Sequence, residues 1–286
     1  LGVAYFTVGQ YEIDNGLDPQ KSLEHAVSVF QKSNAINPKY LNGYIFTAAG
    51  YLYLCDAQVE RGEDPASSID HAIAAYDQSL KIDAKNGYSY SGLAYAYWKK
   101  GKFLQQSGKD PNSVLDQARE ASQKSMSFND QILQTYAIAS ETELVAAQYA
   151  LDHQHSPEKY FNESERIIRK VLAINKNTYD SLGSLSTLCM LRAHYLQKSG
   201  RPISNEIDKG IAAADQALQI NPQMAEVLGT RGKLFLLRAQ SVSASERINA
   251  ALKAEQSFIE AIKIKASLNK LYAQDLEEAR KLKSYE

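Results

Sequence analysis

Two histidine pairs are the residues of this sequence best suited to hold a metal ion. His153 and His155 lie two residues apart beside Asp152, and imidazole with carboxylate is a ligand set that zinc accepts. His25 and His71 lie on two different segments, so a site would need both segments side by side. A two-apart pair without a third ligand at fixed spacing is a weak metal signal. We therefore favour an irregular loop for the first pair and repeated surface histidines for the second.

The loop "RGEDP", residues 61–65, combines a glycine, a carboxylate and a proline, so it could cradle an ion or a phosphate. Asp64, like Asp18 and Asp110 at the same place in other repeats, does not belong to a carboxylate pair suited to general acid–base catalysis. The single glycine of the loop is unlike the clustered glycines of a phosphate-binding loop. A helix boundary explains the same residues: Gly62 can end one helix in a left-handed conformation, Asp64 can cap the next, and Pro65 suits the first helical position.

The sequence shows no arrangement of residues suited to nucleophilic or redox catalysis. Cys55 and Cys189 lie far apart, without the partner spacing of a metal site or a redox dithiol, and they exclude a disulfide framework. No serine or cysteine occurs with a histidine and an acid at the spacing of a known catalytic set. We predict that the chain is not an enzyme and carries no cofactor. A metal-dependent enzyme fragment is the less favoured alternative.

The charges and the apolar segments exclude several classes of partner. The 32 Lys and Arg residues nearly balance the 33 Asp and Glu residues, so no basic surface is expected for nucleic acid. The longest uncharged apolar stretches, 41–55 and 181–191, are shorter than the ~20 residues of a membrane span. The opening "LGVAYFTVGQ" lacks the basic flank of a signal peptide. We expect buried helices, no membrane insertion and a cytoplasmic location.

The sequence repeats with a period of 46 residues. The endings "AINP", "KIDA", "SFND", "AINK" and "QINP" place Asn or Asp at 37, 83, 129, 175 and 221, in steps of 46 (83 − 37 = 46). When the repeats are aligned, a second shared position is occupied by Gly16, Gly62, Gly108 and Gly200, and by Gln154 in the remaining repeat. Self-similarity at a fixed period predicts an array of one repeated structural unit.

Each unit contains two helical patterns. One helix has small residues and aromatics at helical spacing, as in "LGVAY", "TAAGY" and "LAYAY". The other has a small residue, an aromatic four positions later and a small residue three positions after that, which is one face of an α-helix. Small residues there let a neighbouring helix approach closely. The triplets are Ala26/Phe30/Ser33, Ala72/Tyr76/Ser79 and Ala254/Phe258/Ala261.

These columns resemble the tetratricopeptide repeat. The resemblance rests on leucine, small residue and tyrosine in one helix (Leu93, Ala94, Tyr97) and on alanine, aromatic, small residue and terminal proline in the next (Ala26, Phe30, Ser33, Pro38). The usual repeat has 34 residues, so each unit here has 12 more (46 − 34 = 12), located where the first helix enters the loop. We predict first helices of about 20 residues.

The resemblance implies an all-α, right-handed α-solenoid of about six helix pairs in a single domain, residues 1–286. The expected repeats cover 1–40, 41–86, 87–132, 133–178, 179–224 and 225–266, with a cap at 267–286. The segment 267–282 would form an amphipathic capping helix, because a solenoid must close its terminal apolar face. Its apolar side would contain Leu268, Leu271, Tyr272, Leu276 and Ala279.

The long unit with a Gly-x-Asp-Pro loop further resembles the C-terminal repeat arrays of certain bacterial serine/threonine protein kinases. The segment "ERGEDPASSIDHAIAAYDQSLKID" carries this resemblance. It implies that the chain regulates or targets an attached kinase. The glycine-rich loop, lysine and aspartate of a kinase domain do not occur in these 286 residues. The chain also starts inside a first-helix motif, so we expect it to be a fragment of a longer protein.

In tetratricopeptide arrays one side of the first helix lines a concave groove, and here that side carries aromatic rings. The resemblance implies a protein–protein interaction module that binds a protein or peptide segment there, since rings provide large contact area at low entropic cost. Two alternatives remain: the rings pack internally, or the chain assembles with copies of itself into a homo-oligomeric scaffold. The candidate binding residues are Asn42, Phe46, Tyr53, Tyr88, Tyr95, Trp98, Lys99, Gln134, Ile138 and Glu141.

Overall fold

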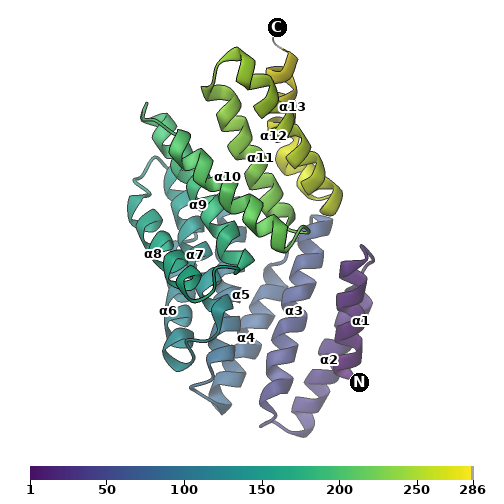
Figure 1. Ribbon diagram of the computed structural model, residues 1–286. Coiled ribbons are helices and arrows are strands. Elements are labelled where there is room, and N and C mark those ends of the chain that lie inside the picture. The colour runs from purple at the N-terminus through teal and green to yellow at the C-terminus, as the bar shows by residue number, and fades with distance from the viewer. Residues whose placement is uncertain (285–286) are drawn as a thin grey trace. The chain divides into compact units, whose positions relative to one another are not determined.

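The computed structural model describes residues 1–284, apart from the side chain of Asp14, and these residues form α-helices with no strand among them (Figure 1). The all-α fold class is therefore confirmed. The last two residues of the expected cap lie outside the described residues. The helices are α1 Gly2–Asp14, α2 Gln20–Ile36, α3 Leu41–Arg61, α4 Ala66–Ile82, α5 Gly87–Gln106, α6 Asn112–Phe128, α7 Leu133–Asp152, α8 Glu158–Ile174, α9 Tyr179–Lys198, α10 Ser204–Ile220, α11 Ala225–Ser241, α12 Ala244–Ile264 and α13 Leu268–Ser284.

The helices follow the 46-residue period as pairs. The first helices α3, α5, α7 and α9 have 20 or 21 residues, whereas the second helices α2, α4, α6, α8 and α10 have 17. The extra residues of the long repeat therefore lengthen the first helix. The sixth pair reverses this pattern, with 17 residues in α11 and 21 in α12.

Contacts between residues divide the chain into two compact units, Leu1–Thr142 and Glu143–Glu286, with the boundary inside α7. In the first unit each helix from α1 to α6 packs against the next, and α3 also contacts α5. In the second unit α8 to α13 pack in the same order, and α11 contacts both α9 and α13. Contact between successive first helices is the stacking expected of a helix-pair array. A single domain spanning the whole chain stays a prediction.

The small residues at equivalent positions of the second helices lie where neighbouring helices pack closely. Ala26, Ala72, Ala118 and Ala254 are fully buried, and the aromatic residues four positions after three of them, Phe30, Tyr76 and Phe258, are buried as well. A small residue at this position lets the neighbouring helix approach, so the large ring can fill the space beside it.

The "RGEDP" loop is a helix boundary in the structure. Gly62 has a φ of +73°, in the left-handed region, and ends α3. Pro65 has helical backbone angles, and the Ala66 N–H donates to Asp64 Oδ1 at 2.9 Å. The interpretation as a cap is therefore confirmed.

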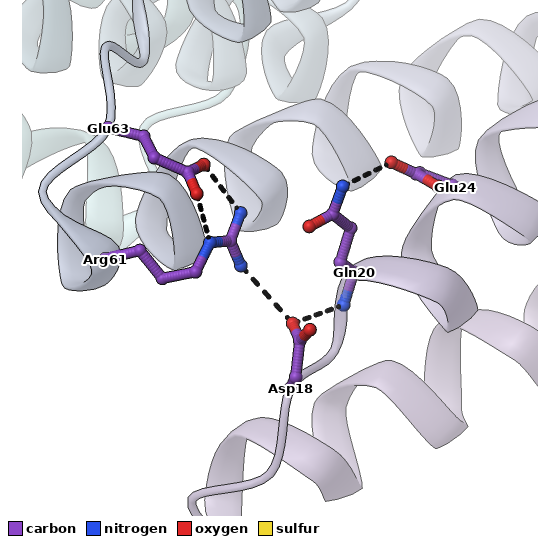
Figure 2. A network of polar contacts seen from close by, with 5 residues as sticks. All are labelled: Asp18, Gln20, Glu24, Arg61 and Glu63. Atoms are coloured by element: carbon purple, nitrogen blue, oxygen red, sulfur yellow. Dashed lines mark hydrogen bonds and ion pairs between the residues drawn. The ribbon is translucent and has the colours of Figure 1, made fainter.

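Arg61 connects this loop to the equivalent loop of the first repeat, as Figure 2 shows. Arg61 Nε donates to Glu63 at 2.7 Å, and Arg61 Nη1 donates to Asp18 at 3.3 Å. Asp18 also accepts from the backbone N–H of Gln20 at 3.1 Å, so it caps α2 at the same time. These groups are exposed, so the bridge aligns neighbouring loops but adds little stability.

Gln154 has a left-handed backbone in a column otherwise filled by glycine. Its φ is +59°, against +66° to +73° for Gly16, Gly62, Gly108 and Gly200. A side chain in this region costs about 1 kcal/mol or more, which glycine avoids. We expect Gln154→Gly to raise the free energy of unfolding by about 0.5 to 1 kcal/mol, measured by urea denaturation. Gly108→Ala should lower it by a similar amount, and a destabilised Gln154→Gly variant would contradict the argument.

The capping helix α13 buries one stripe, but one predicted member of that stripe is wrong. Leu268, Tyr272 and Ala279 are buried, and Leu276 is half-buried against the core of the second unit. Leu271 is 55 % exposed. The buried stripe is narrower than the predicted one, because Leu271 lies on the flank of the Leu268–Tyr272 face, one position before the tyrosine.

Candidate functional site

All ten candidate binding residues lie in the first unit, on three first helices. Helix α3 contains Asn42, Phe46 and Tyr53; α5 contains Tyr88, Tyr95, Trp98 and Lys99; the first half of α7 contains Gln134, Ile138 and Glu141. The structure does not leave them equally accessible. Asn42, Tyr88 and Gln134 are exposed, Glu141 is half-buried, and Ile138 is buried at 5 % exposure.

The two aromatic residues of α3 are partly covered by α1. The Phe46 ring stacks on Phe30 with centroids 5.1 Å apart, and it meets the edge of Phe6 at 6.3 Å. Tyr53 also meets Phe6, at 5.3 Å, and its hydroxyl accepts from Gln10 Nε2 at 3.1 Å. For these two residues the internal-packing alternative therefore holds in part, and they offer less free surface than their positions suggested.

Tyr95 and Trp98 on α5 form a stacked pair with Lys99 between them and α3. The ring centroids are 5.4 Å apart with an interplanar angle of 17°. Lys99 Nζ lies 4.8 Å from the Tyr95 centroid and 5.9 Å from that of Trp98, and it pairs with Asp56 of α3. A cation over aromatic faces is attracted by the ring quadrupoles. Lys99 therefore fixes both rings and is not itself a free ligand-binding group.

Lys99 remains charged in this surrounding. Burial by itself lowers the pKa of a lysine, but Tyr95 and Asp56 outweigh it and hold the pKa of Lys99 above its ordinary value. Burial also raises the pKa of Tyr95, so its hydroxyl stays protonated at neutral pH. The charged Lys99 thus pairs with Asp56 and ties α5 to α3.

Two side chains beside this pair remain available to a partner. Tyr88 is 64 % exposed and lies seven residues before Tyr95, on the same face of α5. Lys102 Nζ lies 5.1 Å from the Trp98 centroid, and it has no ion-pair partner among the residues that the structure describes. We call Tyr88, Tyr95, Trp98, Lys99 and Lys102 the α5 surface.

Lys102 and Asp56 were not among the residues singled out from the sequence. They occupy the same place in successive repeats, 46 residues apart, one helical turn beyond the predicted groove positions. That register could have indicated them, because residues three and four apart on a helix are neighbours. The Lys99–Asp56 pairing depends on how α3 and α5 meet and has no signal within either helix.

Three of the five histidines pack against aromatic rings. His25 stacks on Tyr5 at 5.1 Å and His71 on Tyr51 at 4.8 Å, at equivalent positions of two repeats. His153 lies against Tyr149 at 4.0 Å. Within residues 1–284 no three histidine, cysteine, aspartate or glutamate side chains gather as a metal site would need. The structure therefore gives the repeated histidines a packing role.

Across the described part of the chain, every helix is too short or too polar to cross a membrane.

The fold has counterparts among solved structures, although no family model matches the chain and no curated protein matches it. TTC0263, a thermophilic TPR protein of Thermus thermophilus, is 18 % identical over 80 % of this chain and 99 % of its own, with a TM-score of 0.52. The human IFIT1 dimer with PPP-AAAA is 14 % identical over 98 % of this chain and 67 % of its own, with a TM-score of 0.52.

An IFIT1 monomeric mutant with Gppp-AAAA has a TM-score of 0.55 at 15 % identity. This chain covers 57 % of the length of that IFIT1 chain. At such identities the similarity concerns the fold and not the ligand. Together with the 46-residue helix pairs, it shows that this chain has a tetratricopeptide-repeat-like fold.

Proposed function

We propose that the first unit is a protein-interaction module that binds a peptide segment across the α5 surface. The observation that carries the proposal is an exposed ring, Tyr88, in line with a stacked Tyr95–Trp98 pair that Lys99 holds in place. Rigid aromatic residues next to open surface are typical of binding hot spots, because they bury large area with little loss of entropy.

The chemistry of the surface favours a ligand segment with apolar and acidic residues. Tyr88 offers an exposed ring to apolar side chains, and the half-buried Trp98 adds apolar area beside it. Lys102 offers an ammonium group without a protein carboxylate. A carboxylate of the ligand would gain a charge-assisted hydrogen bond there. The neighbouring Lys99 would contribute positive potential without leaving Asp56.

A random peptide library displayed on phage and selected against the whole chain provides the ligand for the test. We expect Tyr88→Ala and Lys102→Glu each to weaken the selected peptides by about tenfold or more, since each removes a contact worth about 1.4 kcal/mol or more. Fluorescence polarisation of labelled peptides measures the change. Both residues are on the surface, so the fold should remain intact.

Tyr11→Ala is the matched control, since Tyr11 is 63 % exposed but lies on α1, outside the α5 surface. Its peptide affinity should be unchanged. Peptides that bind all three variants equally would place the binding site elsewhere. A library that yields no enriched peptide would reject peptide binding itself.

We also propose that the chain targets or regulates a bacterial serine/threonine kinase to which it is attached. Support comes from the long repeat and its Gly-x-Asp-Pro loop, which resemble the repeat arrays of such kinases. The gene product that contains this sequence decides the matter: a kinase domain in the same polypeptide is expected, and a complete gene product without one would refute the proposal.

A further inference from the structure

A cavity of about 350 Å³ lies in the second unit, between α8, α9 and the start of α10. This volume is within the usual range for small-molecule sites. The α5 surface belongs to the other unit, so the cavity is a separate feature. Its lining includes Glu158, Phe161, Arg192, Tyr195, Arg201 and Glu206.

Glu206 is the unusual residue of this cavity. Its counterparts in the first four repeats, at intervals of 46 residues, are Ser22, Ser68, Val114 and Tyr160, none of them charged. One of its carboxylate oxygens, Oε2, is buried and finds no hydrogen-bond donor among the described residues. A buried carboxylate oxygen without a hydrogen-bond donor is costly. A donor supplied by a ligand would therefore stabilise Glu206 Oε2.

The thiol of Cys189 is adjacent but does not satisfy that requirement. Burial first, and then the Glu206 carboxylate, raise the pKa of Cys189 to about 12, so the sulfur is protonated. A thiol is a weak donor. Glu206 Oε2 would be stabilised far more by a cationic N–H group.

Two arginines add the opposite charge to the same cavity. Arg192 Nη2 pairs with Glu165 at 2.6 Å, and its guanidinium lies 5.7 Å from the Phe161 centroid. A guanidinium has five N–H donors, so this ion pair leaves others for a ligand. Arg201 and Glu158 have no ion-pair partner within the described part of the chain.

An aromatic corner completes the lining. Phe161 and Tyr195 meet edge to face, with centroids 6.2 Å apart. The cavity thus combines two cations, two carboxylates and two rings. A purely anionic ligand would meet Glu158 and Glu206, and a metal ion would meet Arg192 and Arg201, so both are disfavoured.

We propose that this cavity binds a free α-amino acid with an apolar side chain. Its ammonium group would donate to Glu206 Oε2, its carboxylate would accept from Arg201 and Arg192, and its side chain would contact Phe161 and Tyr195. A bidentate arginine–carboxylate contact suits this arrangement.

Thermal unfolding of the whole chain with each of the twenty amino acids, at about 10 mM, tests the proposal, because a ligand of the native state raises the Tm. At least one apolar amino acid should raise it. Calorimetric titration should then show that its methyl ester, which lacks the carboxylate, and its N-acetyl form, which lacks the ammonium, bind at least about tenfold more weakly. No shift with any amino acid, or equal affinity for the blocked forms, would overturn the proposal.

Glu206→Val separates binding from folding, since valine is the residue of the third repeat. The variant should be as stable as the natural chain or more stable, because a buried carboxylate oxygen without a donor is removed, yet it should lose amino-acid binding. Arg201→Ala should also weaken binding by about tenfold or more. Lys109→Ala, at the equivalent position of the third repeat, should leave it unchanged. Retained affinity in both cavity variants would overturn the proposal.

Discussion

Replacing Gly92 by alanine is expected to lower the free energy of unfolding of the first unit by about 3 kcal/mol, although alanine is the better helix former. A Cβ at this position would lie 2.1 Å from Tyr76 Cζ and 2.4 Å from its hydroxyl oxygen. Atoms this close must separate, so either the ring or the helix has to shift. The gain of about 1 kcal/mol in helix propensity is smaller than the cost of such overpacking.

Tyr76 has little room to move away. Its side chain is only 5 % exposed and belongs to the buried cluster that also includes Ala48, Leu93 and Ala94. Cores packed at crystal-like density transmit such displacements to their neighbours. The strain should therefore spread through α4 and α5, which Gly92 brings into contact.

Urea denaturation followed by circular dichroism, with hydrogen exchange to locate the change, measures this effect. Amides of the first unit should lose protection, and those of the second should not. Gly108→Ala is the control, because it has a left-handed φ of +70° with no neighbour within 4 Å. It should cost about 1 kcal/mol from backbone strain alone. Equal effects of both substitutions would contradict the steric explanation.

The sequence predicted the repeat, the helix pairs and the loop chemistry because these depend on local rules. A left-handed glycine, a capping aspartate and a proline act within a few residues, as Gly62, Asp64 and Pro65 do. Because the same pattern recurs in five repeats, an exception in one of them does not hide the period. Even Gln154, the exception in the glycine column, keeps the left-handed backbone of its column.

The candidate sites depend on contacts between helices, and these are less visible in the sequence. Phe46 and Tyr53 were expected in an open groove, but Phe6 of α1 contacts both rings. Lys99 was expected to bind a ligand, but it pairs with Asp56. The register places residues on a helix face, but how much of that face a neighbour covers depends on tertiary packing. The repeat register shows Glu206 as a charged residue among uncharged counterparts, but the missing donor at its Oε2 depends on the fold.

The second large effect concerns the capping helix. Tyr272→Ala is expected to destabilise the C-terminal end of the second unit by about 3 to 5 kcal/mol, the usual range for truncating a buried aromatic residue. Tyr272 is 4 % exposed, and its ring lies tilted against Phe258 with centroids 5.2 Å apart. Its hydroxyl end lies against Gly229 of α11, where any larger residue would collide with the ring. Its removal would open a cavity between α11, α12 and α13.

Polar contacts should not compensate for this loss. Glu255 of α12 accepts from Arg280 Nε at 2.8 Å and from Lys283 Nζ at 2.7 Å, but Arg280 is largely exposed. Pairs of this kind contribute about 1 kcal/mol or less. Once the ring is gone, α13 should therefore separate from α12 at lower urea concentration than the rest of the unit unfolds.

Leu271→Ala is the control for this prediction, because it removes a large apolar side chain from the adjacent, exposed position. It should change the free energy of unfolding by no more than about 0.5 kcal/mol. Hydrogen exchange should show lost protection in α13 for Tyr272→Ala only. If both substitutions destabilised α13 equally, the helix would bury a broader face than the structure shows, as the sequence pattern had predicted. If neither did, α13 would not depend on this stripe to close the apolar end of the array.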